Sequence, residues 1–181
     1  MKLNAEWVTG FVDGEGCFYV GINKHPEMVA GFQVLPELTV VQHERDVQLL
    51  HALKTFFGCG VVRKNHDTRL ALRVRGQENL LRHIVPFFDA HPLQSKKRLD
   101  YEKFRRILLL MAEKAHLDPR GIEVIRGIAS QMNRGAVKIK SSLLGNHEDE
   151  LSEIPCRVSS DLHEWSNDFR TVSERDSAKL K

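Results

Sequence analysis

The sequence predicts an α+β domain built on an antiparallel sheet. Short segments in which apolar and polar residues alternate come in two pairs, and a stretch with helical spacing precedes each pair. Three further helical stretches follow the second pair. Short turns join the two strands of each pair, as in antiparallel hairpins. The predicted element order is therefore α-ββ-α-ββ-α-α-α.

The first helix and the first strand pair have clear boundaries. Asn4 can cap a helix that stops at Gly14-Glu15-Gly16. Residues 17–23 then alternate between apolar and polar side chains, as in a strand with one buried face. A second strand is expected over residues 33–42. Pro36 inside that strand cannot donate a ladder hydrogen bond, so it predicts an edge position or a bulge.

The second half of the domain follows the same signals. Helical spacing over residues 46–57 ends at Gly58, and strands are expected over residues 60–64 and 69–75. Asp118-Pro119 supplies an N-cap and a proline at the first helical position. Three helices are expected after the strands, over residues 77–89, 96–116 and 118–133.

Bulk composition is that of an ordinary globular domain. Of the 181 residues, 41% are hydrophobic and 28% are charged. Apolar runs stay well short of 18 residues, and the first residues form no apolar signal segment, so we expect no membrane span and no secretion. The expected compartment is a bacterial cytoplasm or an organellar matrix or stroma. The cysteines lack CxxC spacing and the nine histidines form no metal-binding pattern, which disfavours a zinc knuckle and a histidine-metal nuclease.

The charge is unevenly distributed along the chain. Residues 141–181 hold nine Asp/Glu and five Lys/Arg, so residues 1–140 carry a net charge of +7 within the overall +3. This division predicts a domain over residues 1–140 and an acidic, polar tail over 141–181 that is partly ordered at best. The net positive charge of the domain over residues 1–140 suggests a polyanionic partner.

The chemistry is expected in residues 7–16. Gly10 and Gly14 lie four residues apart on one helical face, and each costs about 1 kcal/mol relative to Ala in a helix. Such a cost is tolerated where another backbone approaches closely. Glu15 lies at the negative end of the helix dipole, and a hard divalent cation bound by carboxylate and free carbonyl oxygens would compensate it. A surface turn with two solvated acids fits the same residues.

Residues 8–16, VTGFVDGEG, resemble the nine-residue signature of the LAGLIDADG homing endonucleases. The resemblance covers about residues 5–135 in the right order. It implies the αββαββα fold of that family, with a saddle-shaped antiparallel sheet and helices on one face. The further segments that carry it are residues 38–42, 57–60, 92–101, 114–122 and 131–135.

The resemblance implies an active site for hydrolysis of DNA. Glu15 takes the position of the metal-binding acid, and the Gly14 carbonyl would be a co-ligand of Mg²⁺, for which Mn²⁺ or Ca²⁺ can substitute in binding. Gln42 matches the polar residue that organises the attacking water. Lys97 matches the basic residue beside the scissile phosphate. Because Lys96 is adjacent, the match could be shifted by one residue, and Lys96 is the other candidate.

The DNA surface is expected on the sheet. Arg69, Ala71, Arg73 and Arg75 share one face of their strand, which suits a basic strand in a major groove and equally an ordinary half-buried strand. Beside the resemblance, the DNA-binding interpretation is favoured. The full set of residues expected to face DNA is Tyr19, Asn23, Gln33, Thr39, Arg63, Arg69, Arg73 and Arg75.

One copy of the signature implies a homodimer. Two sheets would span about two turns of duplex, so the expected target is long and nearly palindromic, cut to leave 3′ overhangs. The alternatives are an intron RNA maturase with host intron RNA as partner, a non-catalytic DNA-binding protein on the same fold, and a protein that binds no nucleic acid. The expected interface residues are Thr9, Gly10, Asp13 and Gly14, and the role of Asp13 is mainly structural.

Overall fold

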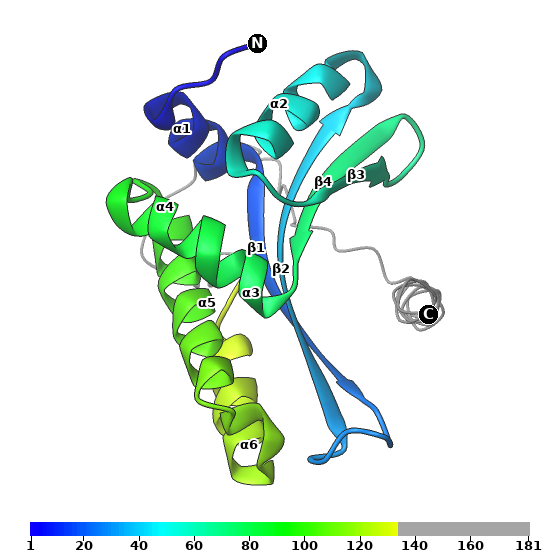
Figure 1. Ribbon diagram of the computed structural model, residues 1–181, viewed down its shortest axis with the longest axis vertical. Helices are drawn as coiled ribbons and strands as arrows, with labels where there is room; N and C mark the ends of the chain where they lie inside the picture. The colour runs from blue at the N-terminus through cyan, green and yellow to red at the C-terminus, as the bar shows by residue number, and fades with distance from the viewer. Residues whose placement is uncertain (134–181) are drawn as a thin grey trace, which may run out of the picture. The chain divides into compact units, whose positions relative to one another are not determined.

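The computed structural model of the protein describes residues 1–133, and the predicted tail over 141–181 lies outside the described residues. The predicted order of helices and strands is confirmed (Figure 1). The elements are α1 (Ala5–Glu15), β1 (Gly16–Lys24), β2 (Phe32–His43), η1 (Glu44–Asp46), α2 (Val47–Phe57), β3 (Val61–Lys64), β4 (Arg69–Arg75), α3 (Gln77–Asn79), η2 (Leu80–Ile84), α4 (Val85–Ala90), α5 (Lys97–Ala112), η3 (Ala115–Leu117) and α6 (Pro119–Ala129).

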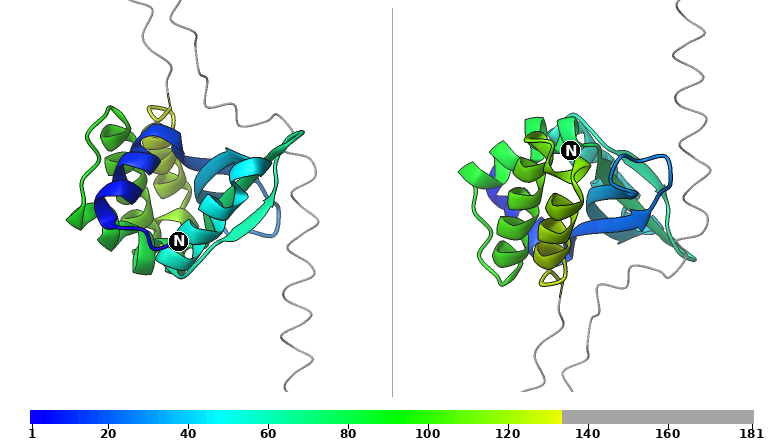
Figure 2. Two further views of the ribbon diagram at one scale, coloured as in Figure 1. Left: turned by 90° about the horizontal axis from the view of Figure 1, so that it is seen from above. Right: turned by 90° about the horizontal axis from the view of Figure 1, so that it is seen from below.

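The four strands form one antiparallel sheet in the order β1-β2-β4-β3. The helices lie on one side of this sheet (Figures 1 and 2). Pro36 pairs with Val20 of β1, whereas the pairing of β2 with β4 stops at Glu37. On the β4 side Pro36 is therefore at an edge, which confirms the edge alternative of the prediction.

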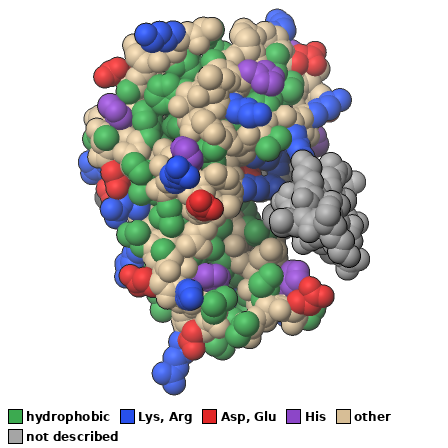
Figure 3. Space-filling view, viewed as in Figure 1, with side chains coloured by type: hydrophobic (Ala, Val, Ile, Leu, Met, Phe, Trp, Pro, Cys, Tyr) green, Lys and Arg blue, Asp and Glu red, His purple; other side chains and the backbone are tan. Residues whose placement is uncertain are grey.

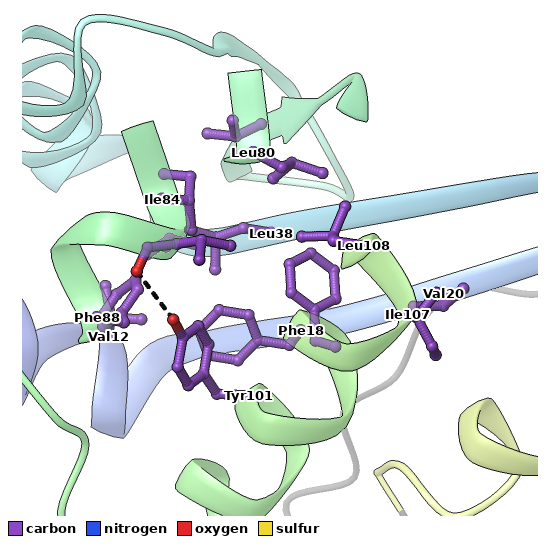
Figure 4. Packing of buried hydrophobic residues seen from close by; sticks show 14 of the residues in the cluster. Val12, Phe18, Val20, Leu38, Leu80, Ile84, Phe88, Tyr101, Ile107 and Leu108 are labelled. Carbon is purple, nitrogen blue, oxygen red and sulfur yellow. Dashed lines mark hydrogen bonds between the residues drawn. The ribbon is translucent and has the colours of Figure 1, made fainter. Parts of the chain in front are cut away.

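The hydrophobic core fills the space between the helices and the sheet. Phe18 of β1 is fully buried and its ring centroid lies 5.5 Å from that of Phe88, 5.3 Å from that of Tyr101 and 5.3 Å from that of Phe104. Figure 4 shows Phe18 beside Tyr101, whose hydroxyl donates a hydrogen bond to the carbonyl of Val85 at 2.9 Å. This aromatic packing fixes α5 against β1.

Capping residues set the helix ends as expected. The Asn4 side chain accepts a hydrogen bond from the N–H of Trp7 at 2.8 Å, and α2 ends at Gly58 in the left-handed region with φ 69°. Asp118 accepts from the N–H groups of Arg120 and Gly121 at the start of α6.

Three predicted helices differ from the structure. The helix expected over residues 77–89 is α3, a π-helical turn and α4. The helix expected to reach residue 116 ends at Ala112, because Lys114 adopts the left-handed region with φ 62° before the 3-10 turn η3. The last helix ends at Ala129 instead of residue 133. Asn133 has φ 51°, and its side chain donates to the carbonyl of Phe18 at 2.8 Å.

Candidate active site and basic sheet face

The junction between α1 and β1 places an acid at a helix end. A Cβ atom on Gly16 would lie 2.5 Å from Val12 Cγ1 and 2.7 Å from the Val12 carbonyl oxygen, so the helix can pass directly into the strand only with glycine there. The Gly16 N–H donates to the same Val12 carbonyl and closes the last turn. Glu15, the last residue of α1, is exposed at this junction.

Asp13 binds the segment that leads into α5. Its Oδ2 accepts hydrogen bonds from the N–H groups of Gln94 and Ser95, each at 2.9 Å, and its Oδ1 accepts from Ser95 Oγ at 2.6 Å. Burial raises the pKa of Asp13, but these hydrogen bonds and the charge of Lys97 outweigh it, and the net pKa is below the ordinary value. Asp13 therefore joins the end of α1 to the start of α5.

Lys97, the first residue of α5, reaches back to α1. Its ammonium donates to the carbonyl oxygens of Val12 and Gly14, both at 3.1 Å. Burial lowers the pKa of Lys97, and the nearby Asp13, Glu15 and Asp100 oppose that shift. Lys96 is exposed. Of the two candidate lysines, Lys97 is the one whose ammonium contacts the end of α1.

The sheet register gives the position of Gln42. Gly16, the first residue of β1, pairs with Val40, and Gln42 lies two residues further along β2, opposite Leu70 of β4. Val40 and Gln42 alternate to the same side of the strand, which is the side that carries the core. Gln42 is thus placed at the end of the sheet where α1 passes into β1.

The oxygen ligands at this junction suit a hard cation only in part. One chain offers the Glu15 carboxylate and the Gly14 carbonyl, and Lys97 also donates to that carbonyl. Within residues 1–133 no group of three or more His, Cys, Asp or Glu is close enough to hold a metal ion. Mg²⁺ keeps several waters and needs only one or two carboxylates, so these residues fit a site completed by water, by a phosphate or by a second chain.

One face of α1 is open. Added Cβ atoms on Gly10 and Gly14 would meet no described atom within 4 Å, their own helix's backbone aside. Packing within residues 1–133 therefore does not require glycine at either position. Thr9, by contrast, is 8% exposed and its hydroxyl donates to the Ala5 carbonyl at 2.9 Å, which leaves it little surface for a partner.

The register places all eight residues expected to face DNA on the same side of the sheet, opposite the core. Asn23 of β1 pairs with Gln33 of β2. Arg73 of β4 pairs with Thr39 of β2 on one side and with Val61 of β3 on the other. Lys and Arg side chains are visible on the β3 and β4 side of the molecule (Figure 3). The residues of this basic sheet face are Tyr19, Asn23, Gln33, Thr39, Arg63, Arg69, Arg73 and Arg75.

The structure adds two residues that sequence reasoning missed. Glu37 of β2 lies opposite Arg75, accepts a hydrogen bond from Arg75 Nε and accepts another from Thr39 Oγ1. Asn65 accepts from Arg73 Nη2 at 2.6 Å. The alternation of β2 could have predicted that Glu37 lies on the basic sheet face, because residues 33, 37 and 39 share one side of the strand.

Known proteins of similar sequence include endonucleases. The family profile described as LAGLIDADG endonuclease matches residues 8–108. An uncharacterized 50.9 kDa protein in ND4 intron 1 of Podospora anserina is 37% identical over 117 residues, which are 64% of this chain and 26% of that protein. The DNA endonuclease I-CvuI of Chlorella vulgaris is 30% identical over 128 residues, 64% of this chain and 80% of that one.

Solved structures similar to this chain are also homing endonucleases. The homing endonuclease I-TnaI is 55% identical, with a TM-score of 0.72 over 75% of this chain and 91% of the other. The I-SmaMI LAGLIDADG homing endonuclease bound to cleaved DNA is 37% identical, with a TM-score of 0.72 over 76% of this chain and 46% of the other. The chain spans between a quarter and a third of the length of several curated relatives that it matches.

Proposed function

Because the chain belongs to the LAGLIDADG endonuclease family, we propose that it is a site-specific endonuclease that cuts both strands of DNA in intron homing. The observation that carries this proposal is the meeting of Lys97 with Gly14 and Glu15. The Lys97 ammonium contacts the Gly14 carbonyl at 3.1 Å, and the exposed Glu15 carboxylate belongs to the next residue. A cation and an acid are thereby close enough for their charges to interact, on two helices that are far apart in the sequence.

Each residue then has a defined task in hydrolysis. Glu15 and the Gly14 carbonyl would hold Mg²⁺, which can polarise a phosphate and lower the pKa of a bound water. Lys97 places a positive charge beside the phosphate, where negative charge develops in the transition state. Gln42 supplies an uncharged hydrogen-bonding group that orients the attacking water. Asp13 holds Ser95 and so fixes the start of the helix that carries Lys97.

The substrate is double-stranded DNA bound across the basic sheet face. Its four arginines provide charge for phosphates and hydrogen-bond donors for base edges. The similar endonuclease I-SmaMI, whose structure was solved bound to cleaved DNA, supports this choice of partner. A bacterial cytoplasm or an organelle that holds the host intron would be the compartment, and among residues 1–133 no helix is long and apolar enough to cross a membrane.

The working assembly is a homodimer joined through the open face of α1. Packing within the described protomer does not explain why glycine stands at positions 10 and 14. A second copy of α1 lying against this face would require small residues there. Two copies bring two Glu15 carboxylates near one axis, so that each strand of the duplex meets one set of catalytic groups. The target is a nearly palindromic site of about two helical turns, cut to leave 3′ overhangs.

The test uses a duplex that joins the exon sequences on either side of the host intron. We expect double-strand cuts in Mg²⁺, none in EDTA, and binding without cutting in Ca²⁺. Sequencing of the cut ends checks the 3′ overhangs. Binding without cleavage in Mg²⁺ and in Mn²⁺ would overturn the nuclease assignment and leave a DNA-binding protein.

A further inference from the structure

The β1–β2 hairpin extends past the rest of the sheet (Figure 1). The pairing of β2 with β4 stops at Glu37, whereas β1 and β2 stay paired as far as Lys24 and Phe32. On the side of the basic sheet face, this extension presents Gly21, Asn23, Gln33 and Leu35. None of these four residues is charged, so on this side the extension offers DNA phosphates no positive charge.

Asn23 and Gln33 are direct cross-strand partners near the tip of the extension. The row between them and Arg75 holds Gly21 and Leu35, which form no side-chain hydrogen bonds. Neither amide has a hydrogen-bond partner within residues 1–133, and the amide nitrogen and oxygen atoms reach solvent. Each amide therefore has a carbonyl and an NH₂ group available to an outside partner.

The hairpin is supported from the other side of the sheet by α6. Phe32 precedes Gln33 and points to the opposite side of β2, where the guanidinium of Arg126 lies 4.7 Å from the centre of its ring. The N–H of His25 donates to the carbonyl of Gly31 at 2.9 Å, and Gly31 has φ 71°, which favours glycine. The backbone that carries the two amides is thus held at both ends of the hairpin turn.

An uncharged amide is suited to the edge of a base. The carbonyl of Asn or Gln accepts from N6 of adenine while the NH₂ group donates to N7. Guanine presents acceptors at both places, so the amide carbonyl finds no donor there. The Cβ atoms of direct cross-strand partners lie about 5 Å apart, and stacked base pairs lie about 3.4 Å apart. The two amides can therefore contact neighbouring base pairs.

The strand length gives the position of this contact along the duplex. Asn23 is seven residues beyond Gly16, where α1 passes into β1. A strand rises about 3.3 Å per residue, so the amides lie about 23 Å from the candidate active site, or about seven base pairs. The arginines of β4 pair with the part of β2 between these two places. They face the inner base pairs, and the amides face the outer ones.

We infer that Asn23 and Gln33 are specificity-determining residues, which read adenines at two neighbouring base pairs in the outer part of each half of the target. The inference rests on the proposed function, because it requires a DNA duplex on the basic sheet face. The arginines contribute affinity through charge, whereas the amides discriminate between sequences without it.

The experiment selects sequences from a randomised duplex library of about two helical turns in Ca²⁺, with the full chain. The variants are Asn23→Ala, Gln33→Ala, Gln33→Arg, Arg69→Gln and the control Gln48→Ala. Gln48 is an exposed amide on α2, so the control removes an amide from the helical layer. Arg69 is an exposed arginine of the sheet face. Affinity for the selected site is also measured at several salt concentrations, and circular dichroism checks folding.

The wild type should enrich A·T at two neighbouring outer base pairs of each half-site. Asn23→Ala and Gln33→Ala should each lose this preference at one of them, by about 10- to 100-fold. The salt dependence of both should stay that of the wild type, because no charge is lost.

The other variants test whether the contact is with a base. Gln33→Arg should prefer guanine where the wild type prefers adenine, because a guanidinium donates to O6 and N7 of guanine. Arg69→Gln should weaken the salt dependence and keep the outer A·T pairs. Gln48→Ala should keep the wild-type profile.

The outcomes separate the two claims. A wild-type chain that enriches no sequence contradicts the proposed function. A wild-type chain that enriches a site without A·T preference in its outer part overturns only the role of the amides. An equal loss of affinity for every sequence in the two alanine variants overturns that role as well, because it places the amides on phosphates. If Asn23→Ala does not fold, the two Gln33 variants give the same comparison.

Discussion

The ammonium of Lys97, at the first residue of α5, lies 3.1 Å from the carbonyl oxygen of Gly14 in the last turn of α1. The chain between them contains the whole sheet. A second set of hydrogen bonds stabilises this contact. Asp13 of the same turn accepts hydrogen bonds from the N–H and the hydroxyl of Ser95, two residues before Lys97.

Lys97 and Lys96 should differ sharply in their effect on cleavage. Lys97→Met removes the charge at the end of α1, and we expect cleavage to fall by about 10²- to 10³-fold, as for loss of one transition-state donor. Lys96→Met removes an exposed charge and should reduce cleavage only slightly. Single-turnover rates on one duplex measure both. Equal losses for the two variants would contradict the assignment of Lys97.

Asp13 should matter for both stability and cleavage. Asp13→Ala removes three hydrogen bonds that order the start of α5, and we expect a loss of about 1 kcal/mol in the free energy of unfolding, as for loss of a helix cap. Cleavage should fall with it, because Lys97 loses its fixed position. The matched control is Asp118→Ala, which removes the cap of α6.

The control separates a local role from general destabilisation. Asp118→Ala should lower the unfolding free energy by a similar amount and leave the cleavage rate close to that of the wild type. Chemical denaturation and single-turnover cleavage are the two measurements. If both variants lower cleavage equally, Asp13 does not act through Lys97.

The contribution of Asp13 to stability should depend on pH in acid. Its pKa in the folded chain is below the ordinary value of about 3.9, because hydrogen bonds favour the charged form. The unfolded chain therefore binds the proton more readily, and the stabilisation is present above the ordinary pKa and lost as the pH falls through the lowered one. The difference in unfolding free energy between wild type and Asp13→Asn should shrink over that range. A difference independent of pH down to full protonation would contradict this.

Gly10 and Gly127 form a matched pair for testing the dimer. Neither position has a described atom within 4 Å of an added Cβ, helix backbone aside. Leucine at either position should raise helix stability by about 0.5–1 kcal/mol. Only Gly10→Leu should block close approach of a second α1. Sedimentation should therefore show weaker dimerisation for Gly10→Leu and the wild-type dimerisation for Gly127→Leu. A dimer unaffected by Gly10→Leu would place the interface elsewhere.

Local sequence signals predicted most of the fold. Alternation in β1, β2 and β4 gave the correct faces, Pro36 indicated an edge, and Asp118 marked the start of α6. These features depend on neighbours in the chain. Helical spacing cannot distinguish an α-helical from a π-helical turn, so the break between α3 and α4 was missed.

Long-range contacts were harder to predict. The acid at Glu15 and the lysine pair were visible in the sequence, but which lysine reaches α1 depends on how α5 docks on α1. The pairing of Glu37 with Arg75 depends on the register between β2 and β4, which no turn joins directly. Sequence alternation indicates the side of a strand and leaves the cross-strand partner open.

The most direct test of the central claim compares wild type with Glu15→Gln on one target duplex. The substitution keeps the size of the side chain and removes the charge that would hold the cation. We predict that both proteins bind the duplex with similar affinity in Ca²⁺-free buffer, and that only the wild type cuts it when Mg²⁺ is added. Cleavage by Glu15→Gln at the wild-type rate would contradict the claim that Glu15 holds the metal at the active site.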